Sequence, residues 1–430
     1  MHLAAHTRCR SRILTLLLAV GFAAPVRAYL PPDPSTTGPW AVGHTSVEAV
    51  DSARGDRTLP VELWYPIDPE NAAGDAAFYE LIDILGPRGI TSEVAIEGAT
   101  ITVRPHLPLV LFSHGSGGIN IQSLTLMETL ASHGFFVASP NHVGNSFRDV
   151  AGVDVPYEDI ATDRPKDLSF LIDYLLARSA DPEDEFFESI SELSIGVAGD
   201  SLGGSTALAM AAGYADSAFG PIPPDPRVRA ILPVSGVASF FSDAELASIQ
   251  IPMLLLGGTL DTSVPIVPNS TRPFDLSDSS FVYRADIHGA THTHFANICD
   301  IANVLLSLNI TINRWAQFGA GALIAPYNQT CVPPALPIRE AVRLQNLYAV
   351  SFFSRHLQGN LFYAPFLTEA YALANEPGVT FFDGSDPVRP GGCGLGAELV
   401  VLLPLIALAA LFAIVVAMGG IPPMHEWVRR

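Results

Sequence analysis

The sequence predicts an α/β domain in which helices flank a mostly parallel central sheet. Three observations lead to this prediction. Short apolar runs of the buried-strand type alternate with helix-forming stretches along most of the 430 residues. Hydrophobic residues make up 49% of the chain, which suffices for a large core. A glycine-rich turn around Ser201 also joins a strand-like run to a helix-forming segment, as a parallel βα unit requires.

The strand-like runs define the predicted sheet. Residues 59–65 alternate apolar and polar side chains and are expected to form an early antiparallel strand. The other runs are short and continuously apolar, as in strands that are covered on both faces: 107–112, 135–139, 193–198, 228–234, 253–256 and 281–285.

Helix-forming stretches lie between these runs and supply the flanking layers. Helices are expected over 124–133 and 204–212. A third is expected over 165–178, with an acidic residue just before it and Pro165 in its first turn. Residues 339–357 have the strongest amphipathic pattern and end before a glycine.

Both ends of the chain are predicted to lie outside the domain, which is assigned to residues 29–382. Residues 1–28 have the basic start, apolar run and small-residue cleavage site of a signal peptide. Residues 383–398 are a linker, 399–418 a transmembrane helix and 419–430 a short basic cytoplasmic tail. The domain is then exported to the periplasm or the cell surface. A cleaved C-terminal sorting tag is the alternative for the apolar run.

Charge and cysteines narrow the partners and the compartment. The formal net charge is −20, so nucleic acid and anionic lipid surfaces are not expected as partners. Cys9 belongs to the predicted leader. In an oxidising compartment Cys299 and Cys331 can form a disulfide that closes a surface insertion, whereas Cys393 has no assigned role.

Ser201 is the predicted nucleophile. It is the central residue of Gly199-Asp200-Ser201-Leu202-Gly203, which matches the motif G-x-S-x-G. A buried-strand run precedes the motif and a helix-forming segment follows it. This strand–turn–helix setting is that of a nucleophile elbow in the α/β-hydrolase fold, where a sharp turn exposes the serine hydroxyl.

The acid and the histidine of this fold follow the serine along the chain. Asp261 and His292 each come after one of the next strand-like runs, so both belong at the carboxyl edge of the sheet. His292 is the predicted general base, and Asp261 is the predicted group that orients it. Asp286 and Asp225 compete for the acid's role, but we expect them to be solvated loop carboxylates.

A metal site is a second interpretation of the neighbouring histidines His288, His292 and His294. No HExxH pattern or cysteine partner accompanies them, so no metal and no cofactor is expected. His288 and His294 are instead expected to be structural or surface residues.

Acyl transfer also requires two backbone N–H groups that stabilise the oxyanion. One is expected from Leu202, the residue after the nucleophile. The other is expected from Ser116, in the glycine-rich loop that follows the strand-like run 107–112.

Three segments of the chain together resemble a known group of enzymes: residues 112–141, the elbow 199–207, and 257–295. They are similar to platelet-activating-factor acetylhydrolases, dienelactone-hydrolase-like proteins and bacterial cutinases. The resemblance covers residues 38–367 and implies ester hydrolysis through an acyl-enzyme without a cofactor. It also implies a triad of Ser201, Asp261 and His292, with Ser116 and Leu202 as oxyanion donors.

The sequence departs from each of these groups. The acetylhydrolases place their acid after the strand that corresponds to residues 228–234, where this chain has Ser235 and Gly236, so Asp261 at the cutinase-like position is preferred. The aromatic residues beside the oxyanion loop of polyester hydrolases are missing, which leaves a polyester substrate unsupported. Dienelactone hydrolases proper use a cysteine in place of Ser201.

Residues 296–338 form an apolar insertion directly after His292, which the resemblance does not cover. Its position suggests a cap over the acyl site. The expected function is that of an exported serine carboxylic-ester hydrolase that acts on a small-molecule or lipid-like ester. A serine peptidase or amidase with the same triad, and a non-catalytic surface binding protein, stay open as alternatives.

Overall fold

The computed structural model describes residues 31–83, 86–103, 105–147, 149, 155–215, 221–318 and 320–385. The predicted leader (1–28), apolar run (399–418) and tail (419–430) lie outside these residues, as does nearly all of the linker, and they stay predictions. Within the described ranges, no helix has both the length and the apolar character needed to cross a membrane.

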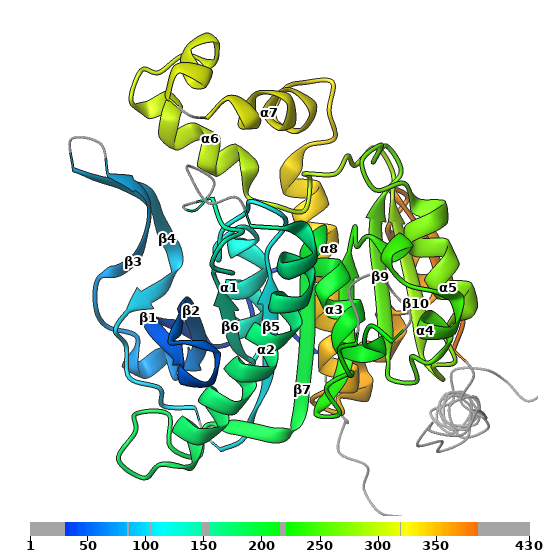
Figure 1. Ribbon diagram of the computed structural model, residues 1–430, viewed down its shortest axis with the longest axis horizontal. Coiled ribbons are helices and arrows are strands. Elements are labelled where there is room, and N and C mark those ends of the chain that lie inside the picture. Colours follow the sequence, from blue (N-terminus) through cyan, green and yellow to red (C-terminus); the bar gives the residue numbers. More distant parts are fainter. Residues whose placement is uncertain are drawn as a thin grey trace, which may run out of the picture. The chain divides into compact units, whose positions relative to one another are not determined.

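The described residues contain one eleven-stranded sheet, in the order β11-β10-β9-β8-β7-β5-β6-β2-β1-β4-β3. Its six central strands run parallel to one another (Figure 1), which agrees with the predicted fold class. Each was predicted within a few residues. They are β5 (Leu107–Ser113), β6 (Phe136–Pro140), β7 (Ile190–Asp200), β8 (Val228–Val234), β9 (Met253–Gly258) and β10 (Val282–Ile287).

Antiparallel pairing extends the sheet at both edges. β2 (Arg57–Ile67) contains the predicted early strand and pairs antiparallel with β6 and with β1 (Ala41–Asp51). β3 (Ala76–Asp83) and β4 (Pro87–Glu97) continue that edge and were not predicted. At the other edge β11 (Val379–Asp383) pairs antiparallel with β10 and reaches the first residue of the predicted linker.

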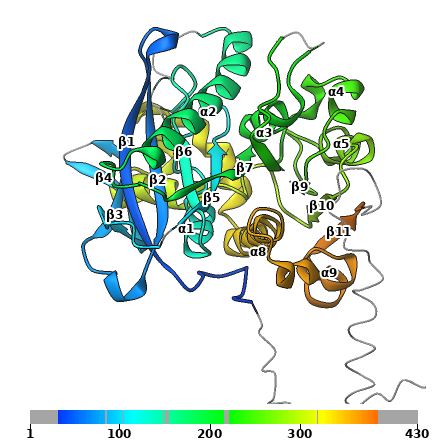
Figure 2. The ribbon, with the colours of Figure 1, turned by 90° about the horizontal axis from the view of Figure 1, so that it is seen from below.

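Helices cover both faces of the sheet (Figure 2), and each face has its own hydrophobic core. In β5, Val110 and Phe112 belong to one core and Leu109 and Leu111 to the other, because successive side chains alternate across a strand. One core includes α1 (Leu124–Ser132), α8 (Ile338–His356) and α9 (Glu369–Asn375), and the other α2 (Tyr157–Ala180), α3 (Leu202–Ala212), α4 (Asp243–Ala247) and α5 (Arg272–Leu276).

The start predicted for α2 was wrong. The helix begins at Tyr157, and Pro165 lies inside it rather than in its first turn. Glu158 and Asp159 occupy the first turn, where negative charge is favourable because of the helix dipole. A proline within a helix removes one backbone hydrogen bond, and the buried face of this long helix compensates for that loss.

Residues 296–338 form a small helical unit, here called the inserted subdomain. It contains α6 (Ile298–Ser307), two 3₁₀ segments and α7 (Ile324–Thr330). The predicted disulfide between Cys299 and Cys331 is present and closes its base, with the two Cα atoms 5.6 Å apart. The subdomain has a separate hydrophobic cluster of Ala302, Leu305, Ile310, Trp315 and Ala320. Its helix α6 contacts β4 (Figure 1).

Candidate active site

Ser201 occupies a strained turn between β7 and α3. Its backbone angles are φ 56° and ψ −118°, a conformation that residues other than glycine rarely adopt. A side chain on Gly203 would overlap the carbonyl oxygen of Ser113, and one on Gly199 would overlap that of Gly203. The glycines of the motif are therefore required by the close approach of backbone segments, as a nucleophile elbow demands.

The structure brings the three predicted triad residues together. The Nε2 atom of His292 lies 2.9 Å from the Ser201 Oγ atom, and its Nδ1 atom lies 2.7 Å from the Asp261 Oδ2 atom. The other carboxylate oxygen of Asp261 accepts hydrogen bonds from the backbone N–H groups of Ser263 (2.9 Å) and Val264 (2.7 Å). Both carboxylate oxygens of Asp261 are thus held by hydrogen bonds, and one of them contacts the imidazole of His292 that also contacts Ser201.

The electrostatic environment favours an ionised Asp261 beside a basic His292. Burial acts to raise the pKa of Asp261, but the hydrogen bonds from His292 and from the backbone of Val264 outweigh it and lower that pKa. Burial likewise acts to lower the pKa of His292, but its hydrogen bond to Asp261 and the negative charge of Asp200 outweigh it and raise that pKa. Burial raises the pKa of Asp200 itself to about 7.

The competing candidates have other partners. The buried Asp286 lies in β10 and forms an ion pair with Arg284 (3.1 Å), and the buried Asp225 pairs with Arg227 (2.6 Å). Neither is the solvated loop carboxylate that the sequence suggested. His288 contacts Thr380 at 2.7 Å, and the buried His294 contacts the Leu336 carbonyl at 3.0 Å. The described residues contain no cluster of three or more metal-ligating side chains.

The first predicted oxyanion donor, Leu202, directly follows Ser201, and the loop that contains the second, Ser116, passes beside Ser201. Leu202 is the first residue of α3, where the backbone N–H has no partner within the helix. The loop of Ser116 passes beside Ser201, because a Cβ placed on Gly115 would lie 3.5 Å from the Ser201 Cβ atom. Among the hydrogen bonds of the described residues, the Ser116 N–H donates none.

Gln122 is a site residue that the sequence did not identify. Its Nε2 atom donates to Asp200 Oδ2 at 2.5 Å, and its Oε1 atom accepts from the Gly115 N–H at 3.0 Å. The backbone carbonyl oxygen of Gln122 accepts a hydrogen bond of 2.6 Å from the backbone N–H of Asn297, at the base of the inserted subdomain. Gln122 therefore joins the elbow, the oxyanion loop and the inserted subdomain. A polar residue near a predicted loop has no sequence pattern that would reveal such contacts.

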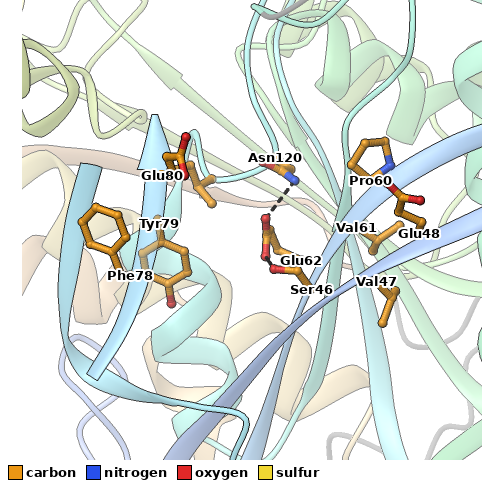
Figure 3. A pocket seen from close by; sticks show the side chains of 11 residues that line it. Ser46, Val47, Glu48, Pro60, Val61, Glu62, Phe78, Tyr79, Glu80 and Asn120 are labelled. Atoms are coloured by element: carbon orange, nitrogen blue, oxygen red, sulfur yellow. Dashed lines mark hydrogen bonds between the residues drawn. The ribbon is translucent and has the colours of Figure 1, made fainter. Parts of the chain in front are cut away.

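A cleft of about 340 Å³ lies between β1–β2 and β3, and Asn120 forms part of its wall (Figure 3). The Asn120 Nδ2 atom donates to the carboxylate of Glu62 at 3.3 Å in the middle of this cleft. The triad residues are not among its walls, so the cleft is separate from the reacting centre.

Comparisons with known proteins point in the same direction. A family model described as platelet-activating factor acetylhydrolase, isoform II, matches residues 32–151, which include the oxyanion loop but not Ser201. No curated protein matches the sequence. A solved structure, the ferulic acid esterase from Streptomyces cinnamoneus, is 23% identical with a TM-score of 0.58, over 82% of this chain and 100% of that one. The likeness to the solved structure supports the α/β-hydrolase fold, and the family model covers less than half of the chain.

Proposed function

We propose that the chain is an exported serine esterase that works through an acyl-enzyme. The observation that carries the proposal is the hydrogen-bonded series from Asp261 through His292 to Ser201 at the tip of a strained elbow. A serine hydroxyl is a poor nucleophile unless a neighbouring base takes its proton, and His292 is within hydrogen-bond distance for that transfer.

The steps follow from this geometry. His292 removes the Ser201 proton as the oxygen attacks the ester carbonyl, and Asp261 stabilises the resulting imidazolium. The N–H groups of Ser116 and Leu202 stabilise the tetrahedral oxyanion, by about 3 kcal/mol per donor. His292 then protonates the leaving alcohol and later activates the water that releases the acid.

Export is supported by the disulfide at the base of the inserted subdomain. Disulfides persist in oxidising compartments and are rare in the cytosol of most organisms. The basic and apolar start of the chain has the pattern of a secretory leader.

The inserted subdomain is proposed to cap the acyl site. The end of α7 lies close to the catalytic base, because Thr330 shares a hydrogen bond of 2.6 Å with Thr293, the residue after His292. Exposed Leu260 lies on the loop that carries Asp261, and exposed Val267 begins the helical segment that follows this loop, so apolar surface lies near the entrance. Replacing residues 300–330 by a short linker is expected to change the preference for acyl chain length. An unchanged preference would reject the cap.

The proposed function is tested by hydrolysis of p-nitrophenyl acetate, butyrate and octanoate with the full chain. Turnover is expected, and Ser201→Ala is expected to abolish it while Ser169→Ala, a serine of α2, leaves it intact. The p-nitroanilide of the same acyl group separates an esterase from an amidase, since an amidase cleaves both. No turnover by the folded native chain would reject the esterase.

A further inference from the structure

We infer that Arg164 of α2 is a positioning residue for the reaction, because its guanidinium holds the loop 113–116 in the orientation that presents the Ser116 N–H to the oxyanion. The inference rests on the proposed function and deepens it. No motif in the sequence singles out this arginine, which lies on a different element from every predicted site residue.

Arg164 is buried and makes several hydrogen bonds to the oxyanion loop. Its side chain is 1% exposed. The Nη1 atom donates to the His114 carbonyl at 2.5 Å, and the Nη2 atom donates to the next carbonyl, that of Gly115, at 3.1 Å. Further bonds go to Ser113 Oγ (3.2 Å) and to Asn145 Oδ1 (2.6 Å). One guanidinium thus binds two successive carbonyl groups of the oxyanion loop.

The geometry of the Gly115–Ser116 peptide bond determines where the Ser116 N–H points. In a trans peptide the carbonyl oxygen and the following N–H point in opposite directions. Because the Gly115 carbonyl is directed at Arg164, the Ser116 N–H must point away from the guanidinium. The Gly115 N–H is already occupied by Gln122 at 3.0 Å. The Ser116 N–H is therefore the group of this loop that stays available beside Ser201.

The loop depends on its hydrogen bonds because it is rich in glycine. Gly115 and Gly117 flank Ser116, and glycine backbones lack the steric limits that fix other peptides. A rotation of the Gly115–Ser116 peptide would replace the N–H by a carbonyl oxygen, whose partial negative charge would repel an oxyanion. The Arg164 Nη2 bond opposes that rotation together with bonds to the same Gly115 carbonyl from His114 Nδ1 (2.7 Å) and from the Gly118 N–H (3.0 Å). The Nη1 bond fixes the preceding carbonyl, that of His114.

The charge of Arg164 is costly to bury unless it has polar partners. Asp167 lies one turn further along α2 and is fully buried. It binds His142 Nδ1 at 2.9 Å and Arg57 Nε at 2.8 Å, and His142 Nε2 in turn lies 2.9 Å from Ser113 Oγ. The loop, Arg164 and Asp167 thus belong to one buried polar network. A hydrogen-bonded buried network of this kind holds the loop in one conformation, and an oxyanion site requires such a fixed conformation.

The inference is tested with Arg164→Lys, which keeps the charge but not the two-pronged donor. Loss of one oxyanion donor lowers kcat by about 10²–10³, so a fall of about a hundredfold in kcat with KM within about threefold is expected. Inhibition by butylboronic acid, which forms a tetrahedral anion on a serine, is expected to weaken by a similar factor. A merely structural residue would not change that inhibition constant.

Arg284→Lys is the matched control, because Arg284 is a buried arginine of β10 outside the site. Its kinetic constants and boronic acid inhibition are expected to stay native. If Arg164→Lys does not fold by circular dichroism, Arg164→Ala assayed with added guanidinium replaces it, and partial recovery of kcat is the expected result.

Different results would reject the role of Arg164 and the proposed function. A folded Arg164→Lys variant with native kcat and native boronic acid inhibition would overturn the role of Arg164, provided that the native chain is active and Ser201→Ala is not. An inactive native chain and an inactive Arg284→Lys variant would instead reject the proposed function.

Discussion

On the acid–base side of Ser201, Asp261 is held by backbone groups two and three residues further along the chain. On the oxyanion side, the loop 113–116 is held by Arg164, which follows it by about fifty residues. The first arrangement depends on a tight turn after β9. The second depends on α2 packing against the centre of the sheet. Local contacts therefore orient the acid of the triad, whereas the oxyanion loop combines local contacts with a contact that is distant in the sequence.

The two sides also differ in burial, which separates catalytic from structural effects. The carboxylates Asp261 and Asp167 are buried on both sides, but the His292 side chain is 22% exposed, whereas the cationic Arg164 is 1% exposed. Changes on the acid–base side are expected to alter turnover with little change in stability. Changes on the oxyanion side are expected to alter both, because they leave a buried charge without its partner.

The largest effect is expected from Asp261→Asn. The amide loses the charge that stabilises the imidazolium and favours the wrong tautomer of His292, so kcat should fall by about 10⁴. Its Oδ1 atom can still accept from Ser263 and Val264, so the free energy of unfolding should change little. Hydrolysis of p-nitrophenyl butyrate and chemical denaturation measure the two quantities. Asp225→Asn is the control, and it should keep kcat. A full loss of stability in Asp261→Asn would break the comparison.

Asp167→Asn, on the oxyanion side, is expected to lower stability as well as turnover. Removing one member of a buried ionic network should lower the free energy of unfolding by about 3–5 kcal/mol. Burial acts to raise the pKa of Asp167, but the hydrogen bonds with His142 and Arg57 outweigh it and lower that pKa. The stability from this group is therefore present above the unfolded pKa of about 3.9 and is lost as the pH falls below it.

Urea denaturation at neutral pH and near pH 3 measures this effect of Asp167. The difference between native chain and variant should shrink at the lower pH. Asp173→Asn, at a mostly exposed ion pair with Arg227 on the same helix, should change stability by less than about 1 kcal/mol. Equal effects of the two substitutions would show that the oxyanion side is no more dependent on buried charge than the surface is.

Replacing both Cys299 and Cys331 by serine probes the point where the two sides meet. The base of the inserted subdomain contacts Gln122 on the oxyanion side through Asn297, and it follows His292 directly. Loss of the disulfide should reduce the stability of the subdomain by about 3–4 kcal/mol. Proteolysis within residues 300–330 should become faster, while hydrolysis of the acetate ester stays within a few-fold. A collapse of acetate hydrolysis would show that the disulfide supports the triad itself.

The features that could be predicted from the sequence are those that depend on a local pattern of residues. β8 was located within its observed bounds because it is continuously apolar, and Ser201, Asp261 and His292 follow in a fixed order after strand-like runs. β1 was missed because it contains the polar His44, which is buried among partners from neighbouring strands, including Glu62 and Glu97.

Arg164 could not be found in the sequence for a similar reason. An arginine at the start of a charged helical segment is usually exposed, and nothing in its neighbours shows which carbonyl groups it reaches. The misplaced start of α2 at Pro165 also hid the fact that Arg164 lies within the helix. Motifs of local geometry are thus visible in the sequence, whereas supports that arise from packing become visible only in the fold.

The smallest effect, and the one that links the two sides, is expected from Asp200→Asn. Asp200 is bonded to Gln122 on the oxyanion side, and its negative charge raises the pKa of His292 on the other. Because the pKa of Asp200 is itself about 7, this charge is only partly present near neutral pH, which keeps the effect small. His292 acts as a base only when neutral, so activity is lost as the pH falls through its pKa. Removing the charge lowers that pKa, and the acid limb of kcat/KM should move to lower pH. Profiles between about pH 5 and pH 9 measure the shift, with Asp243→Asn, an exposed carboxylate of α4, as the control. An acid limb that stays in place or moves to higher pH would mean that the charge of Asp200 does not reach the base, and that the two sides of the site work independently.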